Sequence, residues 1–534
     1  MNLLRILFYL TTVISCTVTV FISSVPAAEK IQLTPEHIEA VNRQRRIILQ
    51  DDVLAKQCFR HDVVGQERME RVVDYYMSKL EETPNQVDSI WFEWGEGNTA
   101  KWPSKVLPQT TNIFPKWWES GVDPIRVLLD EARQRGREVF FSYRINGSDN
   151  DPMFDPPHKF DQPTPLKAEH PDWLINLWHP FWDFSQPGVR DLKLRAVQEV
   201  AQMYDFDGIQ VDFARVAALF PEGQQWVSRD KLTEFMRSLR VVLLDVERQR
   251  GRPLLLAARV PENLMGCHFD GMDVETWARE NLVDIFVLGC RSSNVDVAAF
   301  RRITAGTEIK LYPGFDFHHV SDGYGSSSIE VARGVYANHW NQRPDGVQTF
   351  NLYTASPESA SRLGVSGGSR PPWDVQCQIL RDCGSPETLR FQDKVFYVQR
   401  RGGEQGPPPA NFHTPRWGYF CTNMFESLPA TLDGQAKADT LLTLKVADDV
   451  QADAEKIKKL TLRLLLGSQA DLEVRVNNLL LEAAGREGDW QVFPVQPDQL
   501  AVGGNLVGVK LVDQLSQASG PIRVEKLELH IDYR

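Results

Sequence analysis

Residues 204–215 read YDFDGIQVDFAR, and this segment has the pattern of one strand of a parallel α/β fold. The apolar side chains of Ile209, Val211 and Phe213 alternate with polar ones, which is the period of a β-strand. The preceding segment has helical period instead, because its apolar side chains recur on one helix face. The residues on that face are Val189, Leu192, Ala196, Val200 and Met203. A helix that leads into a strand is the repeating unit of a parallel sheet with crossover helices.

The same unit recurs along residues 45–353. Short, β-rich apolar runs lie at residues 46–50, 89–94, 138–143, 208–213, 253–260, 284–289, 310–314 and 347–353. Eight such units fit a closed (β/α)8 barrel better than an open doubly wound sheet, and no GxGxxG motif follows the first run. We therefore predict a TIM barrel.

The composition changes after residue 365, and RGGEQGPPP at residues 401–409 is typical of a linker. Beyond it, runs such as residues 472–476 and 527–533 alternate apolar and polar side chains between turn-forming segments. We predict a barrel domain over residues 29–375, a linker and barrel extension over residues 376–415, and a C-terminal β-sandwich over residues 416–534, with a start of the sandwich near residue 385 as the alternative.

The N-terminal residues 1–28 have the pattern of a secretory signal peptide, because Arg5 and a long apolar stretch precede the small residues of Val25-Pro26-Ala27. An uncleaved membrane anchor is one alternative. Lipidation at Cys16, which ends a lipobox-like sequence, is another. We expect a secreted or periplasmic protein whose mature form has no membrane span.

The net charge of −12 argues against nucleic acid as a partner, because the chain offers no excess of basic side chains to neutralise phosphates. No CxxC motif or His/Cys cluster indicates a metal site, and we expect no cofactor. Removal of residues 1–28 leaves the cysteines Cys58, Cys267, Cys290, Cys377, Cys383 and Cys421. Cys377 with Cys383 is the simplest disulfide pair to imagine, and buried thiols are the alternative.

Asp212 is the leading candidate for a working carboxylate. It follows the apolar alternation of its strand, so its side chain should point into the C-terminal mouth, where TIM barrels have their active sites. Around it the chain resembles in pattern a glycosyl-hydrolase-like barrel family of exported bacterial proteins, glycosyl hydrolase-like 10. The resemblance also rests on RRIILQDD (45–52), FFSYRIN (140–146), WDFSQPGVR (182–190) and TFNLY (349–353). It covers roughly residues 45–355 and implies a TIM barrel that handles carbohydrate.

A comparison with family 18 chitinases fails at decisive positions. Residues 207–214, DGIQVDFA, line up with the pattern D-G-x-D-x-D-x-E of those enzymes. Gln210 and Ala214 replace two of the acidic residues, and Ala214 stands where the chitinases keep their proton donor. Chitinolysis assisted by the substrate is therefore not expected, although a role of Asp212 as nucleophile or base does not need that residue.

Cleavage of a glycosidic bond requires a second carboxyl group from another strand end. Glu262, which follows the strand of residues 253–260, is the leading candidate for the acid. Asp316, Glu93 and Glu96 are alternatives. An ion pair with Arg215 or a helix cap is the structural alternative for Asp212, and a solvated loop position is the alternative for Glu262.

Further polar and aromatic side chains near the strand ends could contact a substrate. Donors could hold sugar hydroxyls or carboxylates, and tryptophan rings could stack on sugar faces. The candidates are Arg144, Asn146, Trp178, Trp182, Arg215, Arg259, Asp316 and Asn351. Structural pairing remains the alternative for each.

Two functions fit the sequence. The first is an exported glycoside hydrolase that acts on an oligo- or polysaccharide. The second is a catalytically silent barrel that binds glycan or another cell-envelope polymer, because a fold never proves a function.

Cleavage after the small residues at 25–27 predicts a mature chain that begins near Ala28 or Glu29. N-terminal sequencing of the exported protein measures this. A mature chain that retains Met1, or one that begins at a lipidated Cys16, would contradict the prediction.

Overall fold

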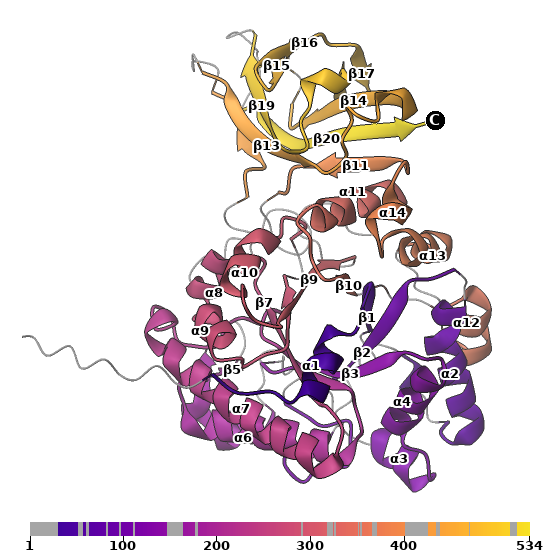
Figure 1. The fold of residues 1–534 in the computed structure, drawn as a ribbon, viewed down its shortest axis with the longest axis vertical. Helices are drawn as coiled ribbons and strands as arrows, with labels where there is room; N and C mark the ends of the chain where they lie inside the picture. The colour runs from indigo at the N-terminus through magenta and orange to yellow at the C-terminus, as the bar shows by residue number, and fades with distance from the viewer. Residues whose placement is uncertain are drawn as a thin grey trace, which may run out of the picture.

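The chain folds into a closed parallel barrel followed by two antiparallel sheets (Figure 1). The computed structural model describes residues 30–51, 57–59, 63–81, 84–95, 98–109, 113–146, 164–176, 180–289, 292–317, 324, 327–350, 352, 355–365, 371–400, 426–433, 438–468, 470–512 and 521–534. The barrel strands are β1 (Ile47–Asp51), β2 (Val87–Gly95), β3 (Glu138–Arg144), β6 (Gly208–Asp212), β7 (Leu255–Val260), β8 (Ile285–Leu288), β9 (Lys310–Asp316) and β10 (Val347–Phe350). They close in the order β1-β10-β9-β8-β7-β6-β3-β2, which confirms the predicted eight-stranded barrel.

Helices surround the barrel and connect its strands. They are α1 (Pro35–Asn42), α2 (Gln66–Glu81), α3 (Ile113–Glu119), α4 (Pro124–Gln134), α5 (Pro165–Glu169), α6 (Pro187–Met203), α7 (Arg229–Arg250), α8 (Leu264–Phe269), α9 (Val274–Arg279), α10 (Val297–Ile303), α11 (Ile329–Trp340), α12 (Pro357–Leu363), α13 (Trp373–Asp382) and α14 (Pro386–Leu389). A short hairpin, β4 (Leu174–Asn176) with β5 (Pro180–Trp182), lies in the connection between β3 and α6. Among the described residues, no helix is long and apolar enough to cross a membrane.

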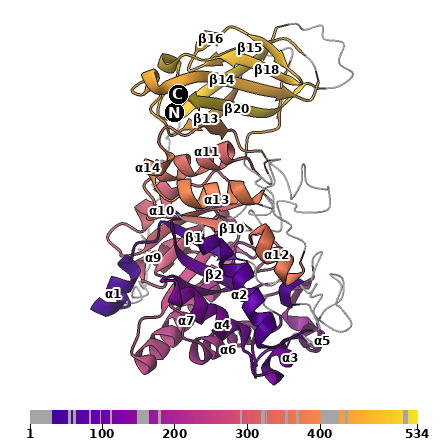
Figure 2. The ribbon, with the colours of Figure 1, turned by 90° about the vertical axis from the view of Figure 1, so that its right-hand side faces the viewer.

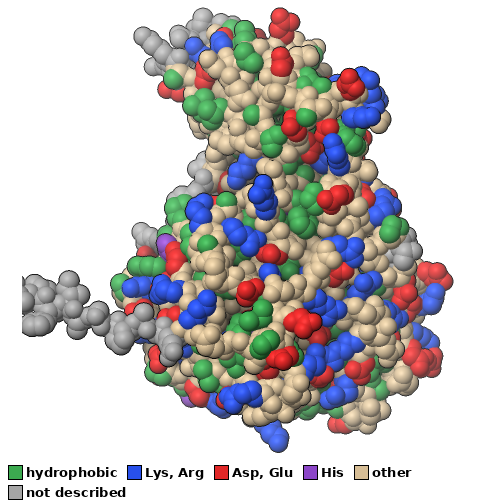
Figure 3. Space-filling model, viewed as in Figure 1, with side chains coloured by type: hydrophobic (Ala, Val, Ile, Leu, Met, Phe, Trp, Pro, Cys, Tyr) green, Lys and Arg blue, Asp and Glu red, His purple; other side chains and the backbone are tan. Residues whose placement is uncertain are grey.

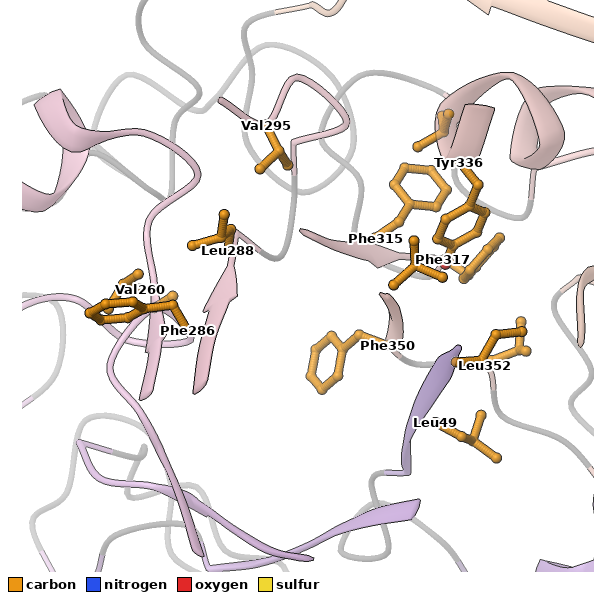
Figure 4. Close-up of a cluster of buried hydrophobic side chains, with 14 of the residues drawn as sticks. Leu49, Val260, Phe286, Leu288, Val295, Phe315, Phe317, Tyr336, Phe350 and Leu352 are labelled. Carbon is orange, nitrogen blue, oxygen red and sulfur yellow. The ribbon is translucent and has the colours of Figure 1, made fainter. Parts of the chain in front are cut away.

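An apolar cluster fills the interior of the barrel near the N-terminal ends of its strands. Its members show which side chains of each strand point inward. They are Val41, Ile48, Trp91, Phe140, Leu255, Ala257, Ile285, Val287 and Tyr312. Phe140 stacks on Trp91 with ring centroids 4.4 Å apart. Gly208 faces this pair, and a Cβ there would lie 2.2 Å from the Phe140 ring, so the absence of a side chain in β6 leaves room for the stack. The opposite face of each strand packs against the helices; in Figure 4, Phe315 and Phe317 cluster with Tyr336 of α11.

Buried ion pairs join α1 to the N-terminal ends of the strands. Val41 of α1 belongs to the interior cluster, so this helix covers that end of the barrel. The ring nitrogens of His37 lie 2.6 Å from Glu247 Oε2 and 3.0 Å from Asp284 Oδ1, and Arg240 pairs with the same Asp284 at 2.6 Å. These groups connect α1, α7 and the start of β8.

The C-terminal part consists of two antiparallel sheets, and this confirms the predicted β-sandwich class. Its strands are β11 (Lys394–Tyr397), β12 (Ala430–Thr431), β13 (Thr440–Val446), β14 (Ile457–Leu466), β15 (Leu472–Val476), β16 (Leu479–Leu481), β17 (Gly485–Glu487), β18 (Trp490–Pro494), β19 (Gly503–Leu511) and β20 (Arg523–Tyr533). One sheet has the order β11-β20-β14-β18-β17, with β12 beside β20, and the other has the order β13-β19-β15-β16. Strand β11 lies inside the segment 376–415 that we expected to be a linker and barrel extension, yet it pairs with β20 of the sandwich.

The sandwich rests on α11 of the barrel (Figure 2). A Cβ on Gly334 of α11 would lie 2.1 Å from the carbonyl oxygen of Val395, so the helix and β11 are in close backbone contact. The Tyr324 hydroxyl donates to Glu528 at 2.7 Å, and its ring stacks on Tyr397 with centroids 4.0 Å apart. The two domains are therefore joined by packed, hydrogen-bonded surfaces.

The disulfide imagined between Cys377 and Cys383 is not formed, because Cys383 is a free and fully buried thiol. Cys377 lies within α13 and Cys383 caps its end. Six residues along a helix of 3.6 residues per turn place the two side chains on different faces. Cys290 and Cys421 lie outside the described residues.

The ion pairs of His37 predict a pH-dependent stability. Burial alone would lower the pKa of His37, but the charge of Asp284 and hydrogen bonds to both carboxylates raise it to about 9. Because the folded protein binds this proton more tightly than the unfolded chain, the stabilisation is complete below pH 6.5 and is lost as the pH rises through 9. A shift of this size corresponds to about 3 kcal/mol. Urea unfolding from pH 6 to pH 9.5 should show this loss, whereas the His37→Gln variant should show a flatter profile. An equal decline in both proteins would refute the assignment.

Candidate active site

Asp212 is the last residue of β6, and its side chain is buried in an ion pair inside the barrel. Its Oδ2 lies 3.1 Å from Arg259 Nη2, and its Oδ1 accepts a hydrogen bond from Arg259 Nε at 3.2 Å. Asp212 and Arg259 are direct neighbours in the pairing of β6 with β7, which explains why they meet. The backbone N–H of Arg215 also donates to Oδ1, at 2.9 Å. The ion pair of Asp212 is therefore made with Arg259, and Arg215 contributes a backbone cap.

Next to this pair, amide and hydroxyl side chains form a hydrogen-bonded layer across the barrel interior. The Ser142 hydroxyl lies 2.7 Å from Gln210 Oε1 and 3.1 Å from Gln50 Nε2. Gln348 Nε2 donates to Gln50 Oε1 at 2.7 Å, and Arg259 Nη1 lies 3.4 Å from the same oxygen. Five strands thus contribute to one connected polar layer. The sequence analysis did not select Gln50, Ser142 or Gln348, although each stands at an inward position of a predicted strand.

Arg144 and Glu93 extend the polar layer on β3 and β2. Arg144 Nε lies 3.6 Å from Glu93 Oε2, and the Ser142 hydroxyl lies 3.0 Å from the same oxygen. The Phe350 ring of β10 covers both guanidinium groups, with the Arg259 carbon 4.0 Å and the Arg144 carbon 5.8 Å from its centroid. Figure 4 shows Phe350 on the other side of the barrel wall from Phe315 and Phe317. The two arginines are therefore held between carboxylates and an aromatic face.

Glu262 and Asp316, the other predicted carboxyl groups, are also buried near strand ends. Glu262 follows β7, and its backbone oxygen accepts a hydrogen bond from Asp296 N at 2.9 Å. A Cβ on Gly289 would lie 2.9 Å from the Cβ of Glu262, so this glycine allows the close approach of the turn after β8. Asp316 ends β9, opposite Phe350 in the register, and shares the inward face of Tyr312. The solvated position considered for Glu262 does not apply.

Asn146 and Trp182, which were predicted to contact the substrate, make internal contacts in this structure. Asn146 donates to the carbonyl of Ala218 at 2.6 Å and accepts from the backbone N–H of Trp182 at 3.0 Å. The Trp182 ring is fully buried, and its Nε1 donates to Asn98 at 2.7 Å. Neither ring face of Trp182 is open to a sugar. Trp178, Asn351 and Glu96 lie outside the described residues.

Trp226 is an aromatic residue on the mouth side that the sequence analysis did not select. It follows β6 in the chain and its side chain is 40% exposed. Its ring packs on the His268 ring, with centroids 4.6 Å apart, and the Arg229 guanidinium lies 4.7 Å from its centroid. Gly271 fits against the carbonyl of Gln225, where a Cβ would come within 2.4 Å. The connection after β7 therefore positions the loop that carries Trp226.

The part of the chain that the structure describes contains no group of three or more His, Cys, Asp or Glu side chains placed to hold a metal ion. His318 and His319 lie outside it.

A closed (β/α)8 barrel with inward carboxyl groups at its C-terminal strand ends is an architecture that can host glycoside cleavage, among other reactions. Residues 61–228 match the family Glycosyl hydrolase-like 10, so the resemblance inferred from the sequence is confirmed. The matched residues include Glu93, Arg144 and Asp212, whereas Arg259 and Glu262 lie beyond them.

Comparisons with individual proteins agree with this class. The chain is 32% identical over 133 residues to "Glycosyl hydrolase DigH" of Escherichia coli (strain K12), which is 24% of this chain and 30% of that protein. It is 34% identical over 89 residues to "1,4-alpha-glucan branching enzyme GlgB" of Salinibacter ruber, or 16% of this chain and 14% of that protein. The chain thus spans less than a third of either relative.

Among solved structures, the PgaB (BpsB) glycoside hydrolase domain from Bordetella bronchiseptica is similar at 12% identity with a TM-score of 0.39. The similarity covers 61% of this chain and 99% of that one. It adds nothing to the fold beyond what the strand pairing establishes.

Removal of one partner of the buried pair should destabilise the barrel. Arg259→Met would leave the Asp212 carboxylate in the interior without its guanidinium, which typically costs about 3–5 kcal/mol. The double variant Arg259→Met/Asp212→Asn should recover part of this loss, because a neutral amide costs less to bury than a charge. Urea unfolding of both variants and of the parent protein measures the effect. Equal stability of Arg259→Met and the parent protein would show that the pair is not the organising contact.

Proposed function

We propose that this chain is an exported glycoside hydrolase that cleaves an oligo- or polysaccharide at the C-terminal mouth of its barrel. The observation that carries the proposal is the position of Asp212, which is inward-facing at the end of β6 and fixed by Arg259. The family of residues 61–228 supports the same reaction class. The signal-peptide pattern of residues 1–28 supports an exported location.

In the proposed mechanism, Asp212 is the nucleophile or base and Glu262 is the proton donor. The donor protonates the glycosidic oxygen as the bond to the anomeric carbon breaks. Asp212 either attacks that carbon or removes a proton from the attacking water, and the positive charge that develops on the sugar ring is stabilised by the carboxylate. Asp316 and Glu93 are the alternative donors, because both are inward-facing carboxyl groups of the same barrel.

Substrate contacts in this proposal come from the groups around the mouth. Arg144 and Arg215 would donate to sugar hydroxyls, and the exposed Trp226 ring would stack on a sugar face. Trp178 and Asn351 remain candidates. Nucleic acid is not a proposed partner, because the chain carries an excess of 12 negative charges.

One observation favours the second candidate function, a catalytically silent glycan-binding barrel. The side chain of Asp212 has no exposed surface and already has Arg259 and the Arg215 N–H as partners. A nucleophile must reach the anomeric carbon, so turnover requires that a substrate gain access to this carboxylate. Measurement of activity separates the two functions.

Asp212→Asn retains the shape of the side chain and removes its negative charge. Turnover on the best glycan of a reducing-sugar screen should fall by several orders of magnitude, because the charge acts on the transition state. Glu262→Gln should impair substrates with poor leaving groups more than activated aryl glycosides, whose departure needs little protonation.

Thermal unfolding of both variants is the control for folding. Near-normal turnover in folded Asp212→Asn would exclude this residue as nucleophile or base. A purified parent protein that binds glycans but releases no reducing ends from them would favour the silent barrel.

A further inference from the structure

A second pocket lies far from the barrel mouth, at the junction of the barrel with the sandwich. Its volume is about 330 Å³, within the range of roughly 300–1,000 Å³ that small-molecule sites occupy. It is bounded by the end of α11, the turn between α14 and β11, the loop after β13 and the end of β20. Figure 3 shows the waist between the two domains, around which side chains of both charges lie. Junctions between domains are frequent places for ligand sites.

Aromatic rings form one wall of this junction pocket. Phe391 is 37% exposed, and its ring meets that of Tyr533 edge to face with centroids 5.8 Å apart. Trp340 of α11 also lines the pocket, and its Nε1 donates to the carbonyl of Cys383 at 2.9 Å. The Arg390 guanidinium lies over one face of the Phe391 ring, 4.6 Å from its centroid, so the other face is the one that a ligand could contact. Such a wall offers flat apolar area to the C–H faces of a ligand.

Carboxylates and cations with fixed partners form the polar part of the lining. Asp448 Oδ2 accepts from Tyr533 at 2.5 Å and from Lys394 at 2.9 Å. Asp453 Oδ1 accepts from Arg390 Nη2 at 3.1 Å. These paired charges offer donors and acceptors, and Arg343 and Asp449 add one further charge of each sign to the lining, so the pocket has no strong preference for a charged ligand. That combination with aromatic faces fits a neutral polyhydroxy compound.

Backbone strain is concentrated at the same place. Among the described residues, five other than glycine have φ between +48° and +70°, and three of them are asparagines, which tolerate this region. The remaining two, Arg343 (φ 56°) and Phe391 (φ 59°), both line the junction pocket. Glycine would be free of strain at either turn. Arg343 and Phe391 stand at these turns despite the strain, which is expected where a side chain has a function such as ligand binding.

We propose that the junction pocket binds a neutral sugar unit of a glycan, with Phe391 as the stacking face and Arg343 as a hydrogen-bond donor. This site is independent of Asp212 and would hold a glycan whether or not the barrel cleaves it. It would give the protein a second contact with a long polysaccharide.

The test uses the unaltered full chain, and reducing ends are assayed in parallel to detect any turnover of the probe. Maltotriose, cellobiose and N,N′-diacetylchitobiose are titrated separately, and binding is followed by saturation-transfer NMR and calorimetry. At least one of these sugars should bind. Phe391→Gly removes the ring, so the Kd should rise about tenfold or more, and a thermal unfolding curve checks that the variant is folded.

Asn478→Gly is the matched control, because it makes the same change at a positive φ of 70° in the β15–β16 turn, away from the pocket. It should leave the Kd unchanged. Arg343→Gly is the second variant and decides the question if Phe391→Gly fails to fold. Absence of binding by all three sugars, or a Kd that neither pocket variant changes, overturns the proposal. The activity of the parent barrel on short aryl glycosides tests the proposed function separately, since Phe391→Gly should not alter it.

Discussion

The buried pair of Arg259 and Asp212 is the interaction on which the upper half of the barrel depends. Neither charge could lie in this interior alone, because the desolvation of an isolated ion is too costly. Strands β6 and β7 pair in a register that places Asp212 directly beside Arg259, so each charge has a partner. The Arg259 guanidinium also donates to Gln50 Oε1 and lies over the Phe350 ring. The amide layer and the aromatic cover follow from the need to satisfy this guanidinium.

The barrel could be predicted from the sequence because its strands are buried on both faces. Such strands appear as short apolar runs with few polar residues, and eight of them at regular intervals leave few alternatives to a closed barrel. Asp212 could be selected for the same reason, since Ile209 and Val211 fix which face of β6 it occupies. The sandwich class followed from the alternation in residues 472–476 and 527–533.

The partners of the site residues could not be predicted, because they depend on contacts between distant segments. Arg259 lies 47 positions from Asp212 in the chain, whereas Arg215 is close in sequence and donates its backbone N–H to Asp212. Trp182 was predicted to stack on a sugar face, but its ring is buried and its Nε1 donates to Asn98. Strand β11 is short and precedes the linker-like segment at 401–409, so the sequence left open whether it belongs to the sandwich, and its pairing with β20 places it there.

Charge is distributed differently at the two ends of the barrel. At the N-terminal end, the cations His37, Arg45 and Arg240 balance the anions Glu138, Glu247 and Asp284 in close ion pairs. At the C-terminal end, the inward strand positions that the structure describes carry three carboxyl groups, on Glu93, Asp212 and Asp316, but only two guanidinium groups, on Arg144 and Arg259. A balanced cluster stabilises a fold. The carboxyl groups of the C-terminal end stand where TIM barrels have their active sites, so this is the end at which a bound sugar could meet them.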